Sequence, residues 1–204
     1  MLGFYNYTVI LTYIGLLSGF AGILCAADGN LKIALIMLMV AGFCDMFDGK
    51  IASTRKRNKA EKRFGIQIDS LSDLICFGVL PAVICFSTTV GRIFHGIIPG
   101  LYVLCALIRL AWFNVDEEMR QDKQTTGRKT YLGLPVTTAA LIVPVFVSLG
   151  EILSLPLEHV TTWLLLVVAV AFLTPFQMKK AGSLGKLGMI LGGIAALLLV
   201  IFGV

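Results

Sequence analysis

The sequence has few charged residues. Asp, Glu, Lys and Arg make up 14% of its 204 residues, whereas 57% are hydrophobic, and the mean hydropathy is +0.90. A soluble domain carries roughly 25% charged residues, so this chain lacks the charge to cover a water-exposed surface. The same composition excludes intrinsic disorder, which needs low hydrophobicity. The net charge of +5 does not indicate nucleic-acid binding, because the basic residues stand in short runs between long apolar segments.

Cysteine and histidine are also scarce, with five and two residues respectively. The cysteines are odd in number and irregularly spaced, and the sequence has no CxxC pair and no Cys/His cluster. Neither a disulfide framework nor a zinc site is therefore predicted. We expect reduced thiols that pack as small apolar groups.

Long apolar segments are abundant. A membrane-spanning helix needs roughly 20 apolar residues, and seven segments reach or approach this length: 5–27, 31–53, 65–87, 95–115, 132–150, 160–177 and 186–204. We predict an all-α fold, a polytopic transmembrane helical bundle of six core helices and a seventh, glycine-rich helix that could be peripheral. No repeat or long linker divides the chain, which predicts a single integral membrane domain over residues 1–204.

Basic residues gather on one side of this predicted bundle. Thirteen of the 17 Lys and Arg residues fall in the connections 54–64, 116–131 and 178–186. The positive-inside rule assigns that side to the cytoplasm. The N-terminus is then cytoplasmic, and seven crossings would place the C-terminus on the opposite side.

Four aspartates interrupt the second and third apolar segments. Asp45 and Asp48 are three residues apart and share one helical face, while Gly65, Asp69 and Asp73 recur every four residues on the next helix. The connection between these helices is short, so they are predicted to be antiparallel neighbours with converging acidic faces. An acid at the centre of a membrane helix costs roughly 2.5–3.5 kcal/mol, and four together need a compensating partner.

The atoms that the aspartates offer as ligands indicate what that partner is. Oxygen-only ligands suit hard cations such as Mg²⁺, Mn²⁺ or Ca²⁺. Gly49 and Ala52 continue the acidic face of the first helix and leave room for a bulky ligand. With a basic rim at 54–64, this pattern predicts a site for a pyrophosphate or polyphosphate group. For any single aspartate, a helix cap or an interfacial ion pair is the alternative; that alternative does not explain four acids on two matched faces.

The acidic motif resembles that of the CDP-alcohol phosphotransferase family. It reads DMFDGKIA over residues 45–52 and GIQIDSLSD over residues 65–73. The family pattern continues with Arg directly after the Ala, whereas this chain has Ser53, Thr54 and then Arg55, and a gap about three residues longer. Arg55 is the predicted substitute. The stretches DSLSDLICFG, RLAWFN and YLGLPVT further resemble the phosphatidylserine synthase branch.

The resemblance implies metal-dependent transfer of a phosphatidyl group from CDP-diacylglycerol to L-serine, which gives phosphatidylserine and CMP. It implies a homodimer, and two divalent ions held by Asp45, Asp48, Asp69 and Asp73. The basic connection 54–64 beside these acids predicts that the active site lies at the cytoplasmic face. Asp73 would also be the catalytic base for the serine hydroxyl. The CDP moiety would contact Asp48, Gly49, Ala52, Arg55 and Gly65.

Four further residues are candidates for binding the acceptor or a phosphate: Arg109, Asn114, Arg128 and Lys129. Arg109 lies inside a predicted span, where a basic residue is a functional candidate by default. Each of the four has a structural alternative, namely an ion pair or snorkelling for Arg109, a helix C-cap for Asn114 and a topology signal for the last two.

Two other functions fit parts of the pattern. The same chemistry could use another alcohol as acceptor, such as glycerol 3-phosphate or inositol phosphate, although a phosphorylated acceptor calls for an additional basic cluster near the site. A divalent-cation transporter would explain the carboxylates but neither the small residues beside them nor the basic rim.

Overall fold

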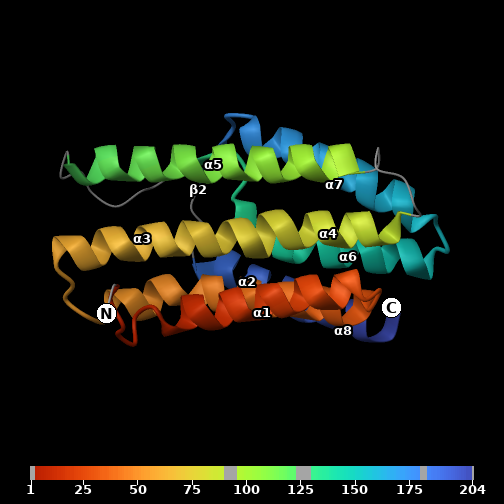
Figure 1. Cartoon of the computed structure of the whole chain (residues 1–204), viewed down its shortest axis with the longest axis horizontal. Helices are drawn as coiled ribbons and strands as arrows, with labels where there is room; N and C mark the ends of the chain where they lie inside the picture. Colours follow the sequence, from red (N-terminus) through yellow and green to blue (C-terminus); the bar gives the residue numbers. More distant parts are fainter. Residues whose placement is uncertain (1–2, 90–95, 123–129, 180–182, 204) are drawn as a thin grey trace.

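The computed structural model describes residues 3–89, 96–122, 130–179 and 183–203. Over these residues the chain forms seven long helical segments that run along one common direction (Figure 1), which confirms the predicted all-α bundle. The first two are α1 (Ile10–Ala27) and α2 (Leu31–Ser53), and the third is a continuous helix formed by α3 (Lys59–Asp73), η1 (Leu74–Val79) and α4 (Leu80–Thr88). The other four are α5 (Ile97–Asp122), α6 (Ala139–Ile152), α7 (Leu157–Leu173) and α8 (Ser183–Gly203). A short helix, η3 (Val136–Thr138), precedes α6.

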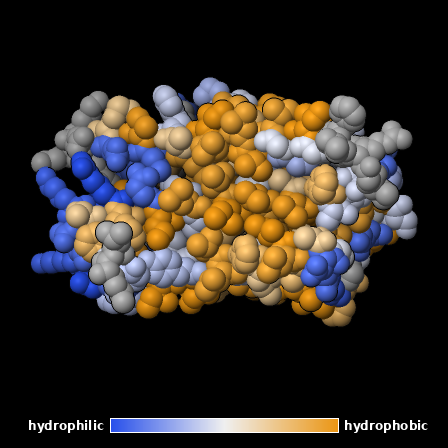
Figure 2. All heavy atoms as spheres, in the orientation of Figure 1, coloured by the Kyte–Doolittle hydropathy of each residue, from blue (hydrophilic) through white to orange (hydrophobic). Residues whose placement is uncertain are grey.

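The helices have the length and composition of a multi-pass integral membrane protein. In the described part of the chain, three are long and apolar enough to cross a bilayer: Ile10–Ala27, Lys59–Thr88 and Ile97–Met119. Shorter apolar helices cover Val136–Ile152, Leu157–Leu173 and Leu191–Gly203. Figure 2 shows hydrophobic side chains across the middle of the molecule and hydrophilic ones gathered toward its ends. A continuous apolar surface of this kind suits contact with lipid chains.

Several observed helix ends differ from the predicted ones, and local residues account for two of them. The third helix begins at Lys59 instead of residue 65, because Asn58 and Glu61 form a capping box. The Asn58 side chain accepts from the backbone N–H of Glu61 at 2.8 Å, and the Glu61 carboxylate accepts from the backbone N–H of Asn58 at 2.9 Å. The fifth segment becomes α-helical only at Ala139, since Gly133 has φ +72° and Pro135 is extended.

A short antiparallel sheet was not predicted from the sequence. Strand β1 (Thr130–Leu132) pairs with β2 (Gln177–Lys179), with Tyr131 opposite Met178. Three-residue strands carry no periodic signal, and these two are more than 40 residues apart in the sequence. The sheet joins the chain before α6 to the chain after α7, at the point where the predicted spans 132–150 and 160–177 overran the helices.

A buried tyrosine compensates for the proline in the third helix. Pro81 has no amide hydrogen, so the carbonyl of Phe77, four residues earlier, loses its helical donor. The hydroxyl of Tyr102 on α5 donates to that carbonyl at 2.7 Å, and both side chains are fully buried. The neighbouring π-helical segment η1 widens the same turn. Satisfying this carbonyl lets the helix continue through a membrane-buried position.

Small residues bring α1 close to the two helices that carry the aspartates. The buried face of α1 contains Gly15, Gly19 and Gly22, and a Cβ at Gly19 would lie 2.5 Å from the Cys76 sulfur on η1. Glycine is needed here because the helix backbones pack in direct contact. As a result, α1 forms one wall of the space between α2 and α3.

The last helix is packed into the bundle. Helix α8 contacts α6 and α2, and its Ala196 and Val200 are buried. The Lys32 ammonium at the start of α2 donates to the Ile201 carbonyl at 2.7 Å, whereas the Phe4 ring packs on Phe64 near the start of α3. The two termini therefore lie at opposite ends of the bundle (Figure 1), as the seven-helix topology predicts.

Candidate active site

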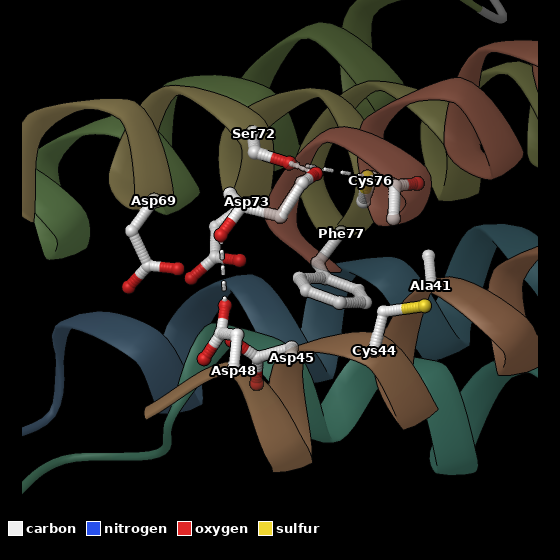
Figure 3. Close-up of a pocket in the computed structure, with 11 residues that line it drawn as sticks. Ala41, Cys44, Asp45, Asp48, Asp69, Ser72, Asp73, Cys76 and Phe77 are labelled. Atoms are coloured by element: carbon white, nitrogen blue, oxygen red, sulfur yellow. Dashed lines mark hydrogen bonds between the residues drawn. The ribbon is translucent and has the colours of Figure 1, made fainter. Parts of the chain in front are cut away.

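The four aspartates converge between α2 and α3, as predicted. Figure 3 shows Asp69 and Asp73 directed from α3 toward Asp45 and Asp48 on α2. All four line a single cavity, together with Thr12 and Gly15 from α1. Asp48 is buried, and the other three carboxylates are half-buried. The two acidic faces thus meet because antiparallel neighbouring helices present them to each other.

The carboxylates are spaced as metal ligands. Asp45, Asp48 and Asp69 each offer an oxygen, and these oxygens all lie within 4.8 Å of one another. Oxygen ligands at 2.0–2.6 Å from a common Mg²⁺ or Ca²⁺ ion can be no more than about 5 Å apart, so this donor set fits a hard divalent ion. Asp73 lies one helical turn further along α3 and lines the same cavity.

Electrostatics also favour a bound cation. Two carboxylates 4.8 Å apart repel by about 3.5 kcal/mol at an effective dielectric constant of 20. Within the described part of the chain, no Lys or Arg forms an ion pair with any of the four aspartates. A divalent ion would remove this repulsion. The cluster could therefore hold a divalent metal ion.

Two hydroxyl residues support the cluster, and sequence reasoning did not single them out. The Thr12 hydroxyl on α1 donates to Asp48 Oδ2 at 3.3 Å. The Ser72 hydroxyl lies 3.5 Å from the Thr12 carbonyl and is also buried. No local motif marks Thr12, because its contact with Asp48 depends on how α1 packs. The hydrogen bond restrains the Asp48 carboxylate in the position from which it faces Asp69.

The cavity is small and closed by apolar groups at its inner end. About 190 Å³ of empty space lies between its walls, and this figure includes space open to solvent. Ala41, Cys44, Cys76 and Phe77 line it beside the acids (Figure 3). The enclosed space is about the size of one water molecule, so it suits an ion, and a phosphate group or nucleotide would have to lie on the adjoining surface.

The small residues of the motif border that surface. Gly49 is exposed on α2, and a Cβ at this position would have no atom within 4 Å. Ala52 lies one turn further on and is half-buried. At Gly65 on α3, by contrast, a Cβ would lie only 3.0 Å from the guanidinium nitrogen Nη1 of Arg57. Gly49 thus faces open space, while the space over Gly65 is occupied by an arginine.

Arg55, the predicted substitute for the arginine of the motif, is directed elsewhere. Its guanidinium lies 3.7 Å from Glu61, and its side chain is 43% exposed. Glu61 is the capping-box residue at the first turn of α3. The geometry therefore places Arg55 at the helix terminus, and its predicted contact with CDP stays a prediction.

The acceptor candidates lie in different surroundings. The Ser70 hydroxyl donates to Asn114 Oδ1 at 2.8 Å, which holds Asn114 of α5 beside the residue that follows Asp69. Arg109 is buried, and its Nε donates to the Leu134 carbonyl at 3.2 Å. This contact ties α5 to the segment before α6. Arg128 and Lys129 lie outside the described residues.

The sequence is similar to those of known proteins. The family model described as CDP-alcohol phosphatidyltransferase matches residues 5–175. The chain is 32% identical over 178 residues to the archaetidylserine synthase of Methanothermobacter thermautotrophicus, covering 86% of this chain and 70% of that protein.

Two further relatives carry the name CDP-diacylglycerol–serine O-phosphatidyltransferase. The Saccharomyces cerevisiae protein is 35% identical over 144 residues, covering 64% of this chain and 51% of that protein. The Bacillus subtilis protein is 32% identical over 114 residues, covering 55% of this chain and 58% of that protein. The chain thus spans little more than half the length of these two relatives. The family match covers most of the chain and includes both halves of the acidic motif, so the chain belongs to the CDP-alcohol phosphatidyltransferase family.

Proposed function

We propose that this protein transfers a phosphatidyl group from CDP-diacylglycerol to the hydroxyl of L-serine, giving phosphatidylserine and CMP. The observation that carries the proposal is the convergence of four aspartates, two from α2 and two from α3, on one cavity in a membrane-embedded bundle. The names of the relatives support serine as the acceptor. The same site with glycerol 3-phosphate or inositol phosphate as acceptor is the alternative.

The donor would bind with its pyrophosphate at the acidic cluster. Asp45, Asp48, Asp69 and Asp73 would hold two divalent ions, Mg²⁺ or Mn²⁺, which when bound neutralise the pyrophosphate and stabilise the departing CMP. The cytidine would extend over Gly49 and Ala52, where the surface is open. The acyl chains would remain beside the apolar helix surfaces, so the lipid need not leave the bilayer.

Asp73 is the residue we assign as general base. The serine hydroxyl oxygen attacks the phosphorus that carries the lipid, and the bond from that phosphorus to the CMP oxygen breaks. The hydroxyl proton passes to the Asp73 carboxylate. A carboxylate is a weak base toward an alcohol, so proton loss has to accompany the attack. The place of Asp73 on the cavity wall beside the three clustered aspartates supports this role.

Asn114 is the acceptor contact that the structure supports best. Its Oδ1 accepts from Ser70, and among the described residues its side-chain amide hydrogens have no acceptor, so they can donate to a ligand. A fixed donor of this kind could bind the carboxylate of serine. Arg109, in contrast, contacts the backbone before α6, and we propose that it orders that segment.

The orientation and assembly of the protein are part of the proposal. The basic connection 54–64 lies at the end of the bundle where α2 stops and α3 begins. By the positive-inside rule this end, with the mouth of the site, faces the cytoplasm. The homodimer implied by the resemblance stays a prediction.

The lipid part of the donor has two candidates. CDP-diacylglycerol is our primary proposal, and a CDP-activated ether lipid is the second, because the archaetidylserine synthase match covers 86% of this chain. Both donors present the same CDP group to the site and differ only in the part that lies in the bilayer.

The decisive experiment is a panel of donors and acceptors. Purified protein with Mg²⁺ or Mn²⁺ is given each CDP-lipid together with serine, glycerol 3-phosphate or inositol phosphate, and CMP release is measured. We expect release with serine, and the faster donor identifies the lipid. Turnover with glycerol 3-phosphate but not with serine would refute the serine assignment. Metal flux into sealed vesicles without any CMP release would favour a transporter.

A further inference from the structure

The basic connection between α2 and α3 contains two arginines in contrasting environments. Arg55 is paired with Glu61 at 3.7 Å and is directed to the first turn of α3. Arg57 is half-buried, and within the described part of the chain it forms no ion pair. Its guanidinium nitrogen Nη1 lies where a side chain at position 65 would be, 3.0 Å from the Cβ that Gly65 lacks. The Arg57 guanidinium therefore lies over α3 at Gly65.

That face of α3 is the one that carries the acids. Gly65, Asp69 and Asp73 follow one another at four-residue intervals, so they are aligned along the helix. Four residues of α-helix rise about 6 Å. The guanidinium therefore stands about one helical turn from the level of Asp69, on the side of the open connection and away from the apolar end of the cavity.

We propose that Arg57, and not Arg55, binds the pyrophosphate of the CDP-lipid donor. This inference rests on the proposed function. The planar guanidinium offers paired N–H donors that match phosphate oxygens. In this position it would contact the pyrophosphate from the side facing the cytoplasm, while the aspartates act from the side facing the membrane. A phosphate group spanning the two would explain why an arginine lies over a glycine next to an acidic cluster.

Arg55 provides a matched control. It is the same residue type, only two positions away, and it contributes the same charge to the rim of the site. A merely electrostatic or topological role of the connection would make the two arginines equivalent. A direct contact from Arg57 would make them different.

The test compares Arg57→Ala, Arg57→Lys and Arg55→Ala in the purified full chain. CMP release is measured as a function of CDP-lipid and, separately, of serine concentration. We expect Arg57→Ala to raise KM for the CDP-lipid by roughly 10- to 100-fold, the range for loss of a charge-assisted hydrogen bond, with KM for serine unchanged. Arg57→Lys should recover only part of the loss, because it keeps the charge without the paired donors. Arg55→Ala removes the same charge from a residue that is paired with Glu61, so it should raise KM for the CDP-lipid clearly less than Arg57→Ala does.

Binding of CDP itself separates this inference from the proposed reaction. CDP should raise the thermal unfolding temperature of the wild type and of Arg55→Ala, and raise it clearly less for Arg57→Ala. If the wild type binds CDP but does not turn over serine, the acceptor assignment fails and this comparison still tests Arg57. Equal KM values and equal CDP effects for Arg57→Ala and Arg55→Ala would overturn the inference, as would a wild type that does not bind CDP.

Discussion

Gly49→Ala should make the protein more stable and less active at the same time. A Cβ at Gly49 would have no atom within 4 Å, so the methyl group adds no clash within the protein. Replacing glycine by alanine in a helix is favourable by roughly 0.5–1 kcal/mol. In a chain of this size, that gain raises the unfolding temperature by about 1–4 °C.

The effect on turnover follows from where that methyl group stands. It would occupy the open surface beside the acidic cluster, which the donor has to approach. A displacement of about 1 Å from the reactive geometry can cost roughly 100-fold in rate, so kcat/KM for the CDP-lipid should fall by about that factor. Gly49→Leu would extend the obstruction and should abolish turnover without changing the charge of the site.

Gly42→Ala on the same helix is the matched control. A Cβ at Gly42 would overlap the Cβ of Ala140 on α6, and overpacking of this kind costs roughly 1–3 kcal/mol. Thermal unfolding in detergent and CMP release should therefore separate the two variants: Gly42→Ala is destabilised, while Gly49→Ala is stabilised but slow. The reasoning is refuted if Gly49→Ala keeps wild-type kcat/KM, or if it unfolds at as low a temperature as Gly42→Ala.

Three other predictions follow from the site. Asp73→Asn should lower kcat by at least about 100-fold while CDP still shifts thermal unfolding; wild-type CMP release from this variant would exclude Asp73 as the base. Chelation of divalent ions should stop CMP release and lower the unfolding temperature, because the carboxylates within 4.8 Å of one another then repel. Chelation should destabilise Asp48→Asn less than the wild type. An unchanged unfolding temperature on chelating the wild type would argue against a metal in this cluster. Asn114→Ala should raise KM for serine by roughly 5- to 10-fold with KM for the CDP-lipid unchanged, whereas a change in the donor KM alone would contradict an acceptor role.

The pairing of the acidic faces was predictable because it depends on local periodicity. Asp45 and Asp48 on one helix, and Asp69 and Asp73 on the next, share faces by spacing alone, and a short connection forces the helices to be neighbours. The seven apolar segments likewise reach or approach the length needed to cross a bilayer, and three helices of the described residues have it. The third helix began six residues earlier than predicted, although its capping signal, Asn58 followed by Glu61, is present in the sequence.

The remaining features depend on contacts between distant parts of the chain. Thr12 reaches Asp48 only because α1 packs closely on α2, and Ser70 meets Asn114 only because α5 lies beside α3. The sequence by itself determined the helices, the membrane environment and the acidic motif, since each is written in residue spacing. Only the tertiary structure decided which of two nearby arginines lies over Gly65 and which pairs with Glu61, because the course of a short connection depends on how the helices at its two ends pack.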